Sequence, residues 1–354
     1  MENIKGKKVL LIGGAGFIGH NLAINLKKLD CEVSIVDGLK VNNLLSLHGF
    51  ENKLEESELY KVIIKERLDL LRKYDIPLFV EDARDYHRLG LVFNKTQPDV
   101  VVQLAAVSHA SRSNKNPHDT FDHSFRTLEN SLDCSKNKVK HFIYFSSSMV
   151  YGNFLTESVN EESECNPLGI YGALKFGGEK LVIAYNQVFK LPYTIIRPSA
   201  LYGERCISRR VGQVFIENAM RGKNIFIKGD GSEKLDFTYI GDLIQGLIKV
   251  IDKEKSRNQI FNLTYGEGRS LKDMASIILK EFPEISLENI KRDDLVPERG
   301  TLNVGKAKQL LGYKPENHLE KGYLKYINWY KELFNINQNI IKNNSGLYLS
   351  QINE

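Results

Sequence analysis

The chain has 354 residues, which is long enough for one large domain or two moderate ones. Hydrophobic residues make up 42% of it and charged residues 26%, a composition typical of a soluble globular protein. The net charge of +5 comes from lysines and arginines scattered among acids, and this mixture argues against a nucleic-acid-binding surface.

The four cysteines are Cys31, Cys134, Cys165 and Cys206. They form no C-x-x-C pair and no metal-ligand spacing with histidines, so we expect reduced thiols and no metal site. Residues 1–5 run directly into a strand, and no stretch of ~18 apolar residues follows to span a bilayer. The sequence therefore predicts a cytoplasmic protein without a membrane segment.

Short apolar runs alternate with helix-like segments through the first half of the chain. The runs occupy residues 9–12, 33–36, 100–104, 142–145 and 194–196. Such runs are typical of strands in a parallel sheet that is buried on both faces. Apolar residues at helical spacing lie between them, for example over 17–29. The pattern predicts an α/β fold built on a doubly wound parallel sheet.

Two regions depart from a minimal version of this plan. The connection over residues 42–79 is long, and residues 55–74 within it predict an added, charged helix. After Pro198 glycines and prolines become frequent, and we expect short strands at 225–227 and 237–240. This second region predicts a smaller α/β domain that closes over the carboxyl edge of the sheet.

These observations divide the chain into two domains and a tail. We expect residues 1–198 to form a first domain around the sheet, to which segments near 236–264 return. Residues 199–337 would form most of the second domain. Residues 338–354 are rich in Asn, Ser and Gln and predict a poorly ordered tail.

The first apolar run leads into a glycine-rich turn. Gly13, Gly16 and Gly19 form a G-x-x-G-x-x-G pattern between a predicted strand and a predicted helix. Glycines allow the tight turn and the close approach of backbone N–H groups to a pyrophosphate, and the helix directs its positive end at that phosphate. In this context the turn predicts a dinucleotide site.

Acids and small residues end the next strands. Asp37 stands 18 residues after Gly19 and can accept both hydroxyls of an adenosine ribose. Its charge would repel a 2′-phosphate, which favours NAD over NADP, although such an acid can also be a turn or cap residue. Asp82 can bond the adenine amino group or be a simple loop residue. The small residues of 104–106 permit close approach of a ligand or helix–sheet packing.

Tyr171 and Lys175 form a Y-x-x-x-K pattern. On a helix this separation of four places both side chains on one face. A lysine ammonium beside a phenol, helped by a positive nicotinamide ring, would lower the tyrosine pKa from ~10 towards neutrality. The phenol could then remove a proton from a sugar hydroxyl while hydride leaves the same carbon. The alternative is a surface helix pair.

A serine-rich segment ends the apolar run at 142–145. Ser147 lies there, 24 residues before Tyr171, at the strand end that faces the ligand crevice in a doubly wound fold. Its hydroxyl could bond the substrate oxygen that the tyrosine deprotonates. A serine-rich loop is otherwise a routine turn.

The ordered set of these motifs resembles the extended short-chain dehydrogenase/reductase family, and within it the NAD-dependent nucleotide-sugar epimerase/dehydratase group. Further pieces of the resemblance are Arg197-Pro198, 201–203, 229–231, 236–242 and 310–313. The match runs in order from about residue 7 to about residue 335.

The resemblance implies a Rossmann domain with tightly bound NAD and a C-terminal domain for a nucleoside-diphosphate sugar. It makes Tyr171 the catalytic base, Lys175 the residue that lowers its pKa and binds the nicotinamide ribose, and Ser147 the third catalytic residue. The residues expected to contact NAD are Gly13, Gly16, Phe17, Ile18, Gly19, Asp37, Asp82, Ala83, Leu104, Ala105, Ala106, Tyr171, Lys175, Pro198 and Ser199.

Departures from the family pattern narrow the expected chemistry. Sugar 4,6-dehydratases carry an Asp-Glu pair directly after the catalytic hydroxyl residue, whereas this chain has Ser148 and Met149. The family often has Arg-Pro-x-Asn, but here Ala200 takes the place of the Asn. Leu235 stands where an arginine commonly precedes Asp-Phe or Asp-Tyr. Epimerisation needs no carboxylate pair and fits what is present.

The substrate is expected to meet a second group of side chains. Guanidinium groups suit phosphate geometry, although each arginine named below can also be a plain surface residue. His109 can contact the sugar or make a structural hydrogen bond. The candidate substrate residues are Ser108, His109, Ser148, Met149, Ala200, Arg209, Arg292 and Arg299.

We therefore predict an NAD-dependent nucleotide-sugar epimerase that acts at C4 through a 4-keto intermediate. The alternatives are a 4,6-dehydratase, a decarboxylase or a sugar oxidoreductase on the same scaffold, and a non-catalytic NAD-binding regulator. The family also implies a homodimer, to which the helix of Tyr171 could contribute Leu181, Ala184 and Tyr185.

Overall fold

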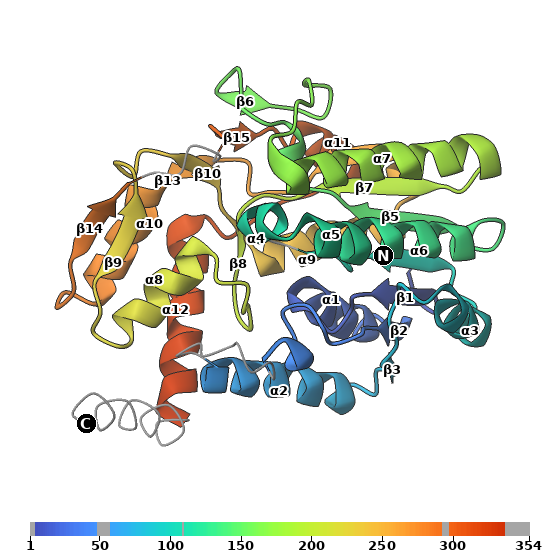
Figure 1. Ribbon diagram of the computed structural model, residues 1–354, viewed down its shortest axis with the longest axis horizontal. Coiled ribbons are helices and arrows are strands. Elements are labelled where there is room, and N and C mark those ends of the chain that lie inside the picture. Colours follow the sequence, from blue (N-terminus) through green and yellow to red (C-terminus); the bar gives the residue numbers. More distant parts are fainter. Residues whose placement is uncertain (1–3, 48–56, 108–109, 292–296, 337–354) are drawn as a thin grey trace.

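A sheet of seven parallel strands lies at the centre of the molecule (Figure 1). The computed structural model describes residues 4–47, 57–107, 110–291 and 297–336. The strands are β1 (Lys8–Ile12), β2 (Glu32–Val36), β3 (Leu78–Phe79), β4 (Val100–Gln103), β5 (His141–Phe145), β7 (Tyr193–Arg197) and β12 (Gln259–Asn262). Their order is β12-β7-β5-β4-β1-β2-β3, which confirms the predicted doubly wound parallel sheet.

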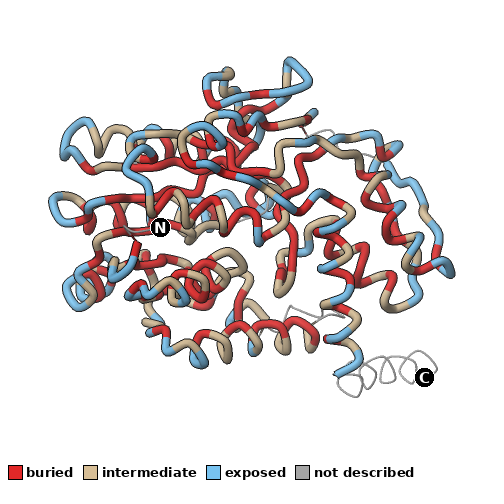
Figure 2. The backbone as a smooth tube through the Cα atoms, turned by 180° about the vertical axis from the view of Figure 1, so that it is seen from behind, coloured by how far each residue is buried: buried red, intermediate tan, exposed pale blue. Residues whose placement is uncertain are grey.

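Helices cover both faces of this sheet, because successive strand residues point to opposite sides. On one face Val9 and Leu11 share a core with α1 (Phe17–Lys27), α9 (Ile240–Asp252) and α11 (Gly305–Leu311). On the other face Leu10 and Ile12 pack with α3 (Tyr86–Thr96), α6 (Thr127–Ser135) and α7 (Gly169–Phe189). Figure 2 shows the buried segments running through the middle of the molecule.

The chain reverses its direction of winding between β1 and β4. It adds β2 and β3 on one side of β1, then returns to add β4, β5, β7 and β12 on the other side. Strand β4 pairs with β1 from Val9↔Val100 to Ile12↔Gln103, and the amide of Ala105 still bonds the Ile12 carbonyl at 2.9 Å. The carboxyl ends of β1 and β4 thus meet at a topological switch point, where doubly wound proteins bind ligands.

The C-terminal part of the chain builds a second core with short strand pairs. Its helices are α8 (Val211–Ala219), α10 (Leu271–Glu281) and α12 (Leu319–Ile336). Its strand pairs are β8 (Leu201–Tyr202) with β11 (Thr238–Tyr239), β9 (Ile225–Lys228) with β14 (Leu287–Ile290), and β10 (Lys234–Asp236) with β13 (Gly268–Ser270). Buried aromatic side chains of α8 and α12 fill this core.

Short elements complete the connections. Strands β6 (Ser158–Val159) and β15 (Thr301–Leu302) pair, and α4 (Ala110–Lys115) and α5 (Pro117–Phe121) precede α6. Residues Asp122–Arg126 form a π-helical turn, and single 3₁₀ turns occupy Leu44–Leu47, Ser148–Val150 and Glu254–Ser256.

The helix expected over residues 55–74 is present as α2 (Ser57–Lys73). Strand β12 pairs with β7 in the central sheet, whereas the strands near 236–242 pair outside it, β10 with β13 and β11 with β8. The division at residue 198 stays a prediction, and the expected tail of 338–354 lies outside the described residues. In the described part of the chain, none of the helices combines the length and apolarity needed to cross a membrane.

Candidate functional site

A cavity opens at the switch point. It is lined by every residue expected to contact the adenosine and pyrophosphate parts of a dinucleotide, from the glycine turn to the end of β4. These residues are Gly13, Gly16, Phe17, Ile18, Gly19, Asp37, Asp82, Ala83, Leu104, Ala105 and Ala106. The sequence did not single out other residues of the lining, among them Lys40, Arg67, His123, Thr127 and Arg210.

The glycine turn is packed too closely for side chains. Gly13 has a φ of +81°, and a Cβ there would lie 2.6 Å from the amide nitrogen of Ala105. A Cβ on Gly19 would lie 2.5 Å from the Cα of Gly14. The turn can therefore place backbone N–H groups and the start of α1 against the cavity. This is the arrangement that a pyrophosphate requires.

The carboxylate of Asp37 is held at the end of β2. It accepts hydrogen bonds from the amides of Ala15, at 3.0 Å, and Leu39, at 2.8 Å. Burial raises its pKa, and the two amide bonds act in the opposite direction. Each carboxylate oxygen has a second lone pair, so Asp37 can still accept ribose hydroxyls. The cavity thus fits the adenosine end of NAD.

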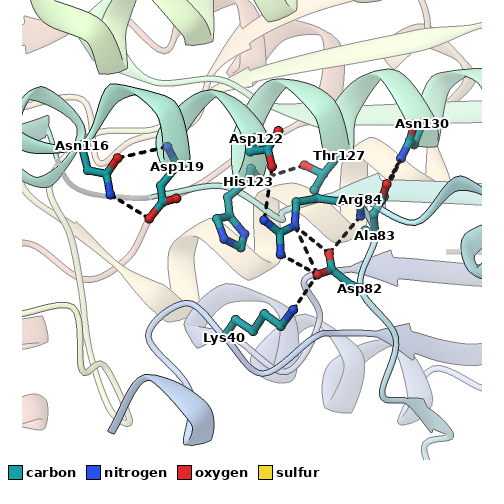
Figure 3. Close-up of polar contacts among 10 residues, drawn as sticks. All are labelled: Lys40, Asp82, Ala83, Arg84, Asn116, Asp119, Asp122, His123, Thr127 and Asn130. Carbon is teal, nitrogen blue, oxygen red and sulfur yellow. Dashed lines mark hydrogen bonds and ion pairs between the residues drawn. The ribbon is translucent and has the colours of Figure 1, made fainter. Parts of the chain in front are cut away.

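Asp82 is engaged by two cations (Figure 3). Its carboxylate accepts from Arg84 at 2.7 Å and from Lys40, which reaches across from the loop after β2, at 2.8 Å. The hydrogen bonds of Arg84, and then of Lys40, hold the pKa of Asp82 well below its usual range. Arg84 also pairs with Asp122 at 3.3 Å. The contact of Asp82 with adenine stays a prediction, since these partners occupy part of its carboxylate.

The π-helical turn before α6 supplies a further wall of the cavity. Thr127 donates to the carbonyl of His123 at 2.9 Å, and both residues line the cavity (Figure 3). Burial lowers the pKa of His123. Widened helical turns of this kind are frequent at functional sites. The pattern of residues in the sequence does not predict one here.

Tyr171, Lys175 and Ser147 converge near the carboxyl end of β5. Tyr171 and Lys175 lie one turn apart on α7, and the Lys175 ammonium is 5.9 Å from the centre of the Tyr171 ring. Ser147 follows β5 and caps the Ser148–Val150 turn by accepting from the Met149 amide at 3.2 Å. The Ser147 side chain acts to lower the pKa of Tyr171, which favours the phenolate.

The electrostatics around Tyr171 differ from the sequence expectation. Burial raises the pKa of Tyr171, while the charge of Arg210 and the Ser147 side chain lower it by less. Burial lowers the pKa of Lys175 to about 8, and its ammonium donates to the carbonyl of Phe145 at 2.6 Å. Lys175 is not among the groups that act on the pKa of Tyr171 here, because its ammonium is directed at a backbone carbonyl. The expected lowering by Lys175 and a bound nicotinamide ring stays a prediction.

A buried ion pair orients α7. Arg197, at the end of β7, donates to Glu179 of α7 at 2.7 and 2.9 Å. The hydroxyl of Ser146 also bonds Glu179, which distinguishes it from Ser147. Pro198 and Ser199 follow directly, and the Pro198 carbonyl accepts from the amide of Ser148 at 2.9 Å. Neither Pro198 nor Ser199 lines the adenosine cavity, so their contact with nicotinamide stays a prediction.

A second cavity lies against the C-terminal core. Ala200, Arg209 and Arg299 line it, as does Leu235, whereas Arg210 lines both cavities. Ala200 has a φ of +36°, a strained value for a residue with a side chain and one often found at functional sites. Three of the predicted substrate residues thus meet in one place, beside the group around Tyr171.

The lining of the second cavity carries mostly positive charge. Arg209, Arg210, Arg299 and Lys228 contribute to it, and Glu233 is the acid that faces them. Glu233 accepts from Arg299 at 3.2 Å. Guanidinium groups bind phosphate oxygens in pairs, so this lining suits a diphosphate.

The remaining predicted substrate residues divide into two groups. Ser148 and Met149 are buried, and the Met149 sulfur lies 3.9 Å from a guanidinium nitrogen of Arg299. Ser108, His109 and Arg292 lie outside the described residues.

A doubly wound sheet, a glycine turn with a ribose-binding acid, and a tyrosine–lysine–serine group together define a dinucleotide-dependent enzyme. Residues 9–264 match the model of the family described as "NAD dependent epimerase/dehydratase family". The chain belongs to this family, and it is an NAD-dependent enzyme of the nucleotide-sugar epimerase/dehydratase type.

Named relatives include both epimerases and dehydratases. The Bacillus subtilis (strain 168) protein YtcB, an uncharacterized UDP-glucose epimerase, is 28% identical over 334 residues, which are 92% of this chain and 99% of that protein. A Dictyostelium discoideum dTDP-D-glucose 4,6-dehydratase is 29% identical over 286 residues. That match covers 73% of this chain but only 58% of the dehydratase.

A solved structure agrees with the fold along most of the chain. It is the UDP-glucuronic acid 4-epimerase of Bacillus cereus in complex with UDP-glucuronic acid and NAD, with a TM-score of 0.80 and 25% identity. The match covers 92% of this chain and 99% of the other.

Proposed function

We propose that this enzyme inverts the configuration at C4 of a nucleoside-diphosphate sugar. The observation that carries the proposal is the convergence of Ser147, Tyr171 and Lys175 beside Ser148 and Met149. The first three can remove and return a hydroxyl proton. The last two offer no carboxylate for the elimination that a 4,6-dehydratase performs.

The proposed chemistry begins at the C4 hydroxyl. Tyr171 accepts the hydroxyl proton, and Ser147 donates a hydrogen bond to the same oxygen as the 4-keto group forms. NAD held in the cavity would supply the hydride acceptor and donor that inversion at C4 needs, and its oxidised form would add positive charge near the phenol. Tyr171 then gives its proton back, so the reaction consumes no net acid or reductant.

The second cavity supports the choice of a nucleoside-diphosphate sugar. The positive charge of three arginines in the lining can neutralise two phosphate charges: Arg209, Arg210 and Arg299. The half-exposed Phe226 of strand β9 also lines this cavity. Because Arg210 lines both cavities, it would lie between the diphosphate and the reacting end of the sugar. The relatives described above are named for UDP- and dTDP-linked sugars, which are the substrates to test first.

Product analysis tests the proposal. The purified protein would be incubated separately with UDP-, dTDP- and GDP-sugars, and the products identified by NMR and mass spectrometry. A C4 epimer of unchanged mass is the expected product, and Tyr171→Phe should not form it. A 4-keto-6-deoxy sugar, one water lighter, would show a dehydratase instead. Loss of carbon dioxide, or net reduction of NAD, would show a decarboxylase or a sugar oxidoreductase.

We further propose that the enzyme is a homodimer that pairs through α7. Leu181, Ala184 and Tyr185 are partly exposed there, and Val188 and Phe189 beyond them are 70% and 36% exposed. Apolar side chains gathered on one helix end are typical of a contact between subunits. Light scattering tests this, since a dimer mass is expected and a monomer mass would contradict it.

We propose a cytoplasmic location as well. All four cysteines are free thiols in the structure, which supports a reducing compartment. Fractionation of cells that express the tagged protein would test it, and recovery in a membrane or secreted fraction would contradict it.

A further inference from the structure

Helix α2, the insertion after β2, connects the two cores of the molecule. Its first half places Leu59, Tyr60 and Ile63 in the C-terminal core, among the side chains of α8 and α12. Its second half places Leu71 in the core of the central sheet. In Figure 1 the helix extends from the side of α12 to the region of β3. Helix α2 therefore spans the boundary beside which the dinucleotide cavity lies.

Buried polar contacts fasten α2 to the C-terminal core. The hydroxyl of Tyr60 donates to Glu217 of α8 at 2.9 Å, and Tyr330 of α12 donates to the other carboxylate oxygen at 2.7 Å. Near the middle of α2, Glu66 forms an ion pair with Arg205 at 3.0 Å. Buried hydrogen bonds to a charged group are strong, so α2 is not a loosely attached insertion.

The next residue of α2, Arg67, is a buried cation. It is 1% exposed, and its guanidinium donates to the carbonyls of Arg205, at 2.8 Å for Nε, and of Asn42, at 3.4 Å. These acceptors are neutral. In the described part of the chain, no carboxylate oxygen lies within 4.0 Å of this guanidinium. Burial lowers its pKa to about 10, while Cys206 and then Asp37 act to raise it.

Further positive charge surrounds Arg67 on the side of the glycine turn. Arg205 donates through its Nε to His20 of α1 at 3.1 Å, and the opposite ring nitrogen of His20 contacts the Gly16 carbonyl at 2.8 Å. Asp37 is the nearby acid that favours the charge of Arg67. A guanidinium removed from water without a paired anion is energetically unfavourable, so a bound anion would be strongly attracted.

The place of that anion follows from the cavity. Arg67 lines the same cavity as Gly13, Gly16 and Asp37, where the pyrophosphate of a dinucleotide would meet the glycine turn. We propose that Arg67 binds the NAD pyrophosphate and that α2 acts as a strap, held by both cores, which keeps the cofactor in its cavity. This inference rests on the NAD dependence of the family and not on the proposed C4 reaction.

The strap has a use in any reaction that removes and returns the same hydride. Such a reaction fails if the reduced cofactor leaves before the hydride has been returned. A cation on a helix anchored to both cores would slow that departure. The property is measurable without any sugar substrate.

The test compares Arg67→Met with Arg72→Gln, which changes an arginine on the same helix whose side chain is 78% exposed. The full-length proteins would be purified with the NAD they retain, and the bound dinucleotide measured after acid release. The rate of NAD release would be followed with excess alcohol dehydrogenase and ethanol, which reduce only free NAD. For Arg67→Met we expect less retained NAD and release at least about tenfold faster, the factor that ~1.4 kcal/mol of lost interaction produces. Arg72→Gln should behave as the parent protein.

Thermal unfolding separates this role from a purely structural one. If Arg67 binds the cofactor, added NAD should raise the Tm of Arg67→Met less than that of the parent. If Arg67 only joins α2 to the carbonyl of Arg205, the variant should lose Tm yet release NAD at the parent rate, which would overturn the proposal. Arg67→Lys keeps the positive charge, and it replaces Arg67→Met in the comparison if Arg67→Met does not fold. It should release NAD more slowly than Arg67→Gln, and equal rates for the two would also overturn the proposal.

Discussion

Arg197 and Glu179 form a two-pronged ion pair between the end of β7 and the middle of α7, with side chains only 3% and 2% exposed. Glu179 lies one turn beyond Lys175, so the pair fixes the helix that carries Tyr171 and Lys175 against the sheet. Arg197 also donates to Tyr151 at 3.0 Å. The sequence placed Arg197 within a family motif, and the structure gives that motif a positioning role.

Removal of one partner should therefore destabilise the fold strongly. We expect Glu179→Ala to lower the free energy of unfolding by about 3–5 kcal/mol, because it leaves the Arg197 guanidinium buried without its anion. Urea unfolding followed by circular dichroism measures this. The double variant Glu179→Leu/Arg197→Met removes both charges and should recover much of the loss. Equal destabilisation of the single and double variants would contradict the argument.

The adjacent residues Ser146 and Ser147 should differ in their effects on kcat and on stability. Ser147→Ala removes the hydroxyl that acts to lower the pKa of Tyr171 and that would bond the substrate oxygen, and we expect kcat to fall by roughly 10²-fold or more. Ser146→Ala removes the hydroxyl that bonds Glu179, and should lower stability while leaving most of kcat. Steady-state kinetics and thermal unfolding on both variants measure the two effects. A reversal of the pattern would assign the catalytic hydroxyl to Ser146.

Much of this architecture was predictable from the sequence. The apolar runs of β1, β2, β4, β5 and β7 are buried on both faces, and that leaves a plain signal of uninterrupted hydrophobicity. The spacing along the chain between the glycine turn and Asp37 follows from the geometry of one strand, one turn and one helix. These parts are local, so a short stretch of sequence contains the reason for each.

The parts that the sequence did not predict depend on distant residues. Arg67 looks like one more charge on a charged helix, and only the packing of α2 between the two cores buries it. The charge of Arg210 acts on the pKa of Tyr171 because the C-terminal part of the chain folds against the sheet, and no local pattern in the sequence shows this. The spacing of Tyr171 and Lys175 along a helix likewise does not reveal the Phe145 carbonyl to which the Lys175 ammonium is directed.

Arg210 leads to a prediction about pH. Its charge lowers the pKa of Tyr171, against the larger effect of burial, which raises that pKa. A base must lose its proton to act, so activity should rise with pH as Tyr171 ionises. Without the charge of Arg210 the phenolate is less stable, and the ascending limb should move to higher pH. Each unit of that shift lowers kcat/KM at neutral pH about tenfold.

Arg210→Gln tests this prediction, with Arg209→Gln as the matched variant. Arg209 lines the second cavity but does not act on the pKa of Tyr171, so its loss should raise KM without moving the pH profile. The profile of kcat/KM against pH, measured for the parent and both variants, gives the answer. A limb that stays in place for Arg210→Gln would exclude the proposed influence on Tyr171.

Asp37 should decide the preference between the two dinucleotides. Its carboxylate is fixed by the amides of Ala15 and Leu39 in the lining of the cavity, where a 2′-phosphate would meet its negative charge. Asp37→Asn keeps the shape and one acceptor oxygen but removes the charge. We expect the ratio of bound NAD to NADP to fall by roughly tenfold or more, since a hydrogen bond to a charged group contributes ~1.5–3 kcal/mol.

The measurement is the composition of dinucleotide retained after incubation with equal concentrations of both. Asp82→Asn is the matched control, because the predicted adenine contact would be common to both cofactors and its loss should weaken both alike. An unchanged ratio in Asp37→Asn would mean that the preference for NAD comes from elsewhere in the cavity.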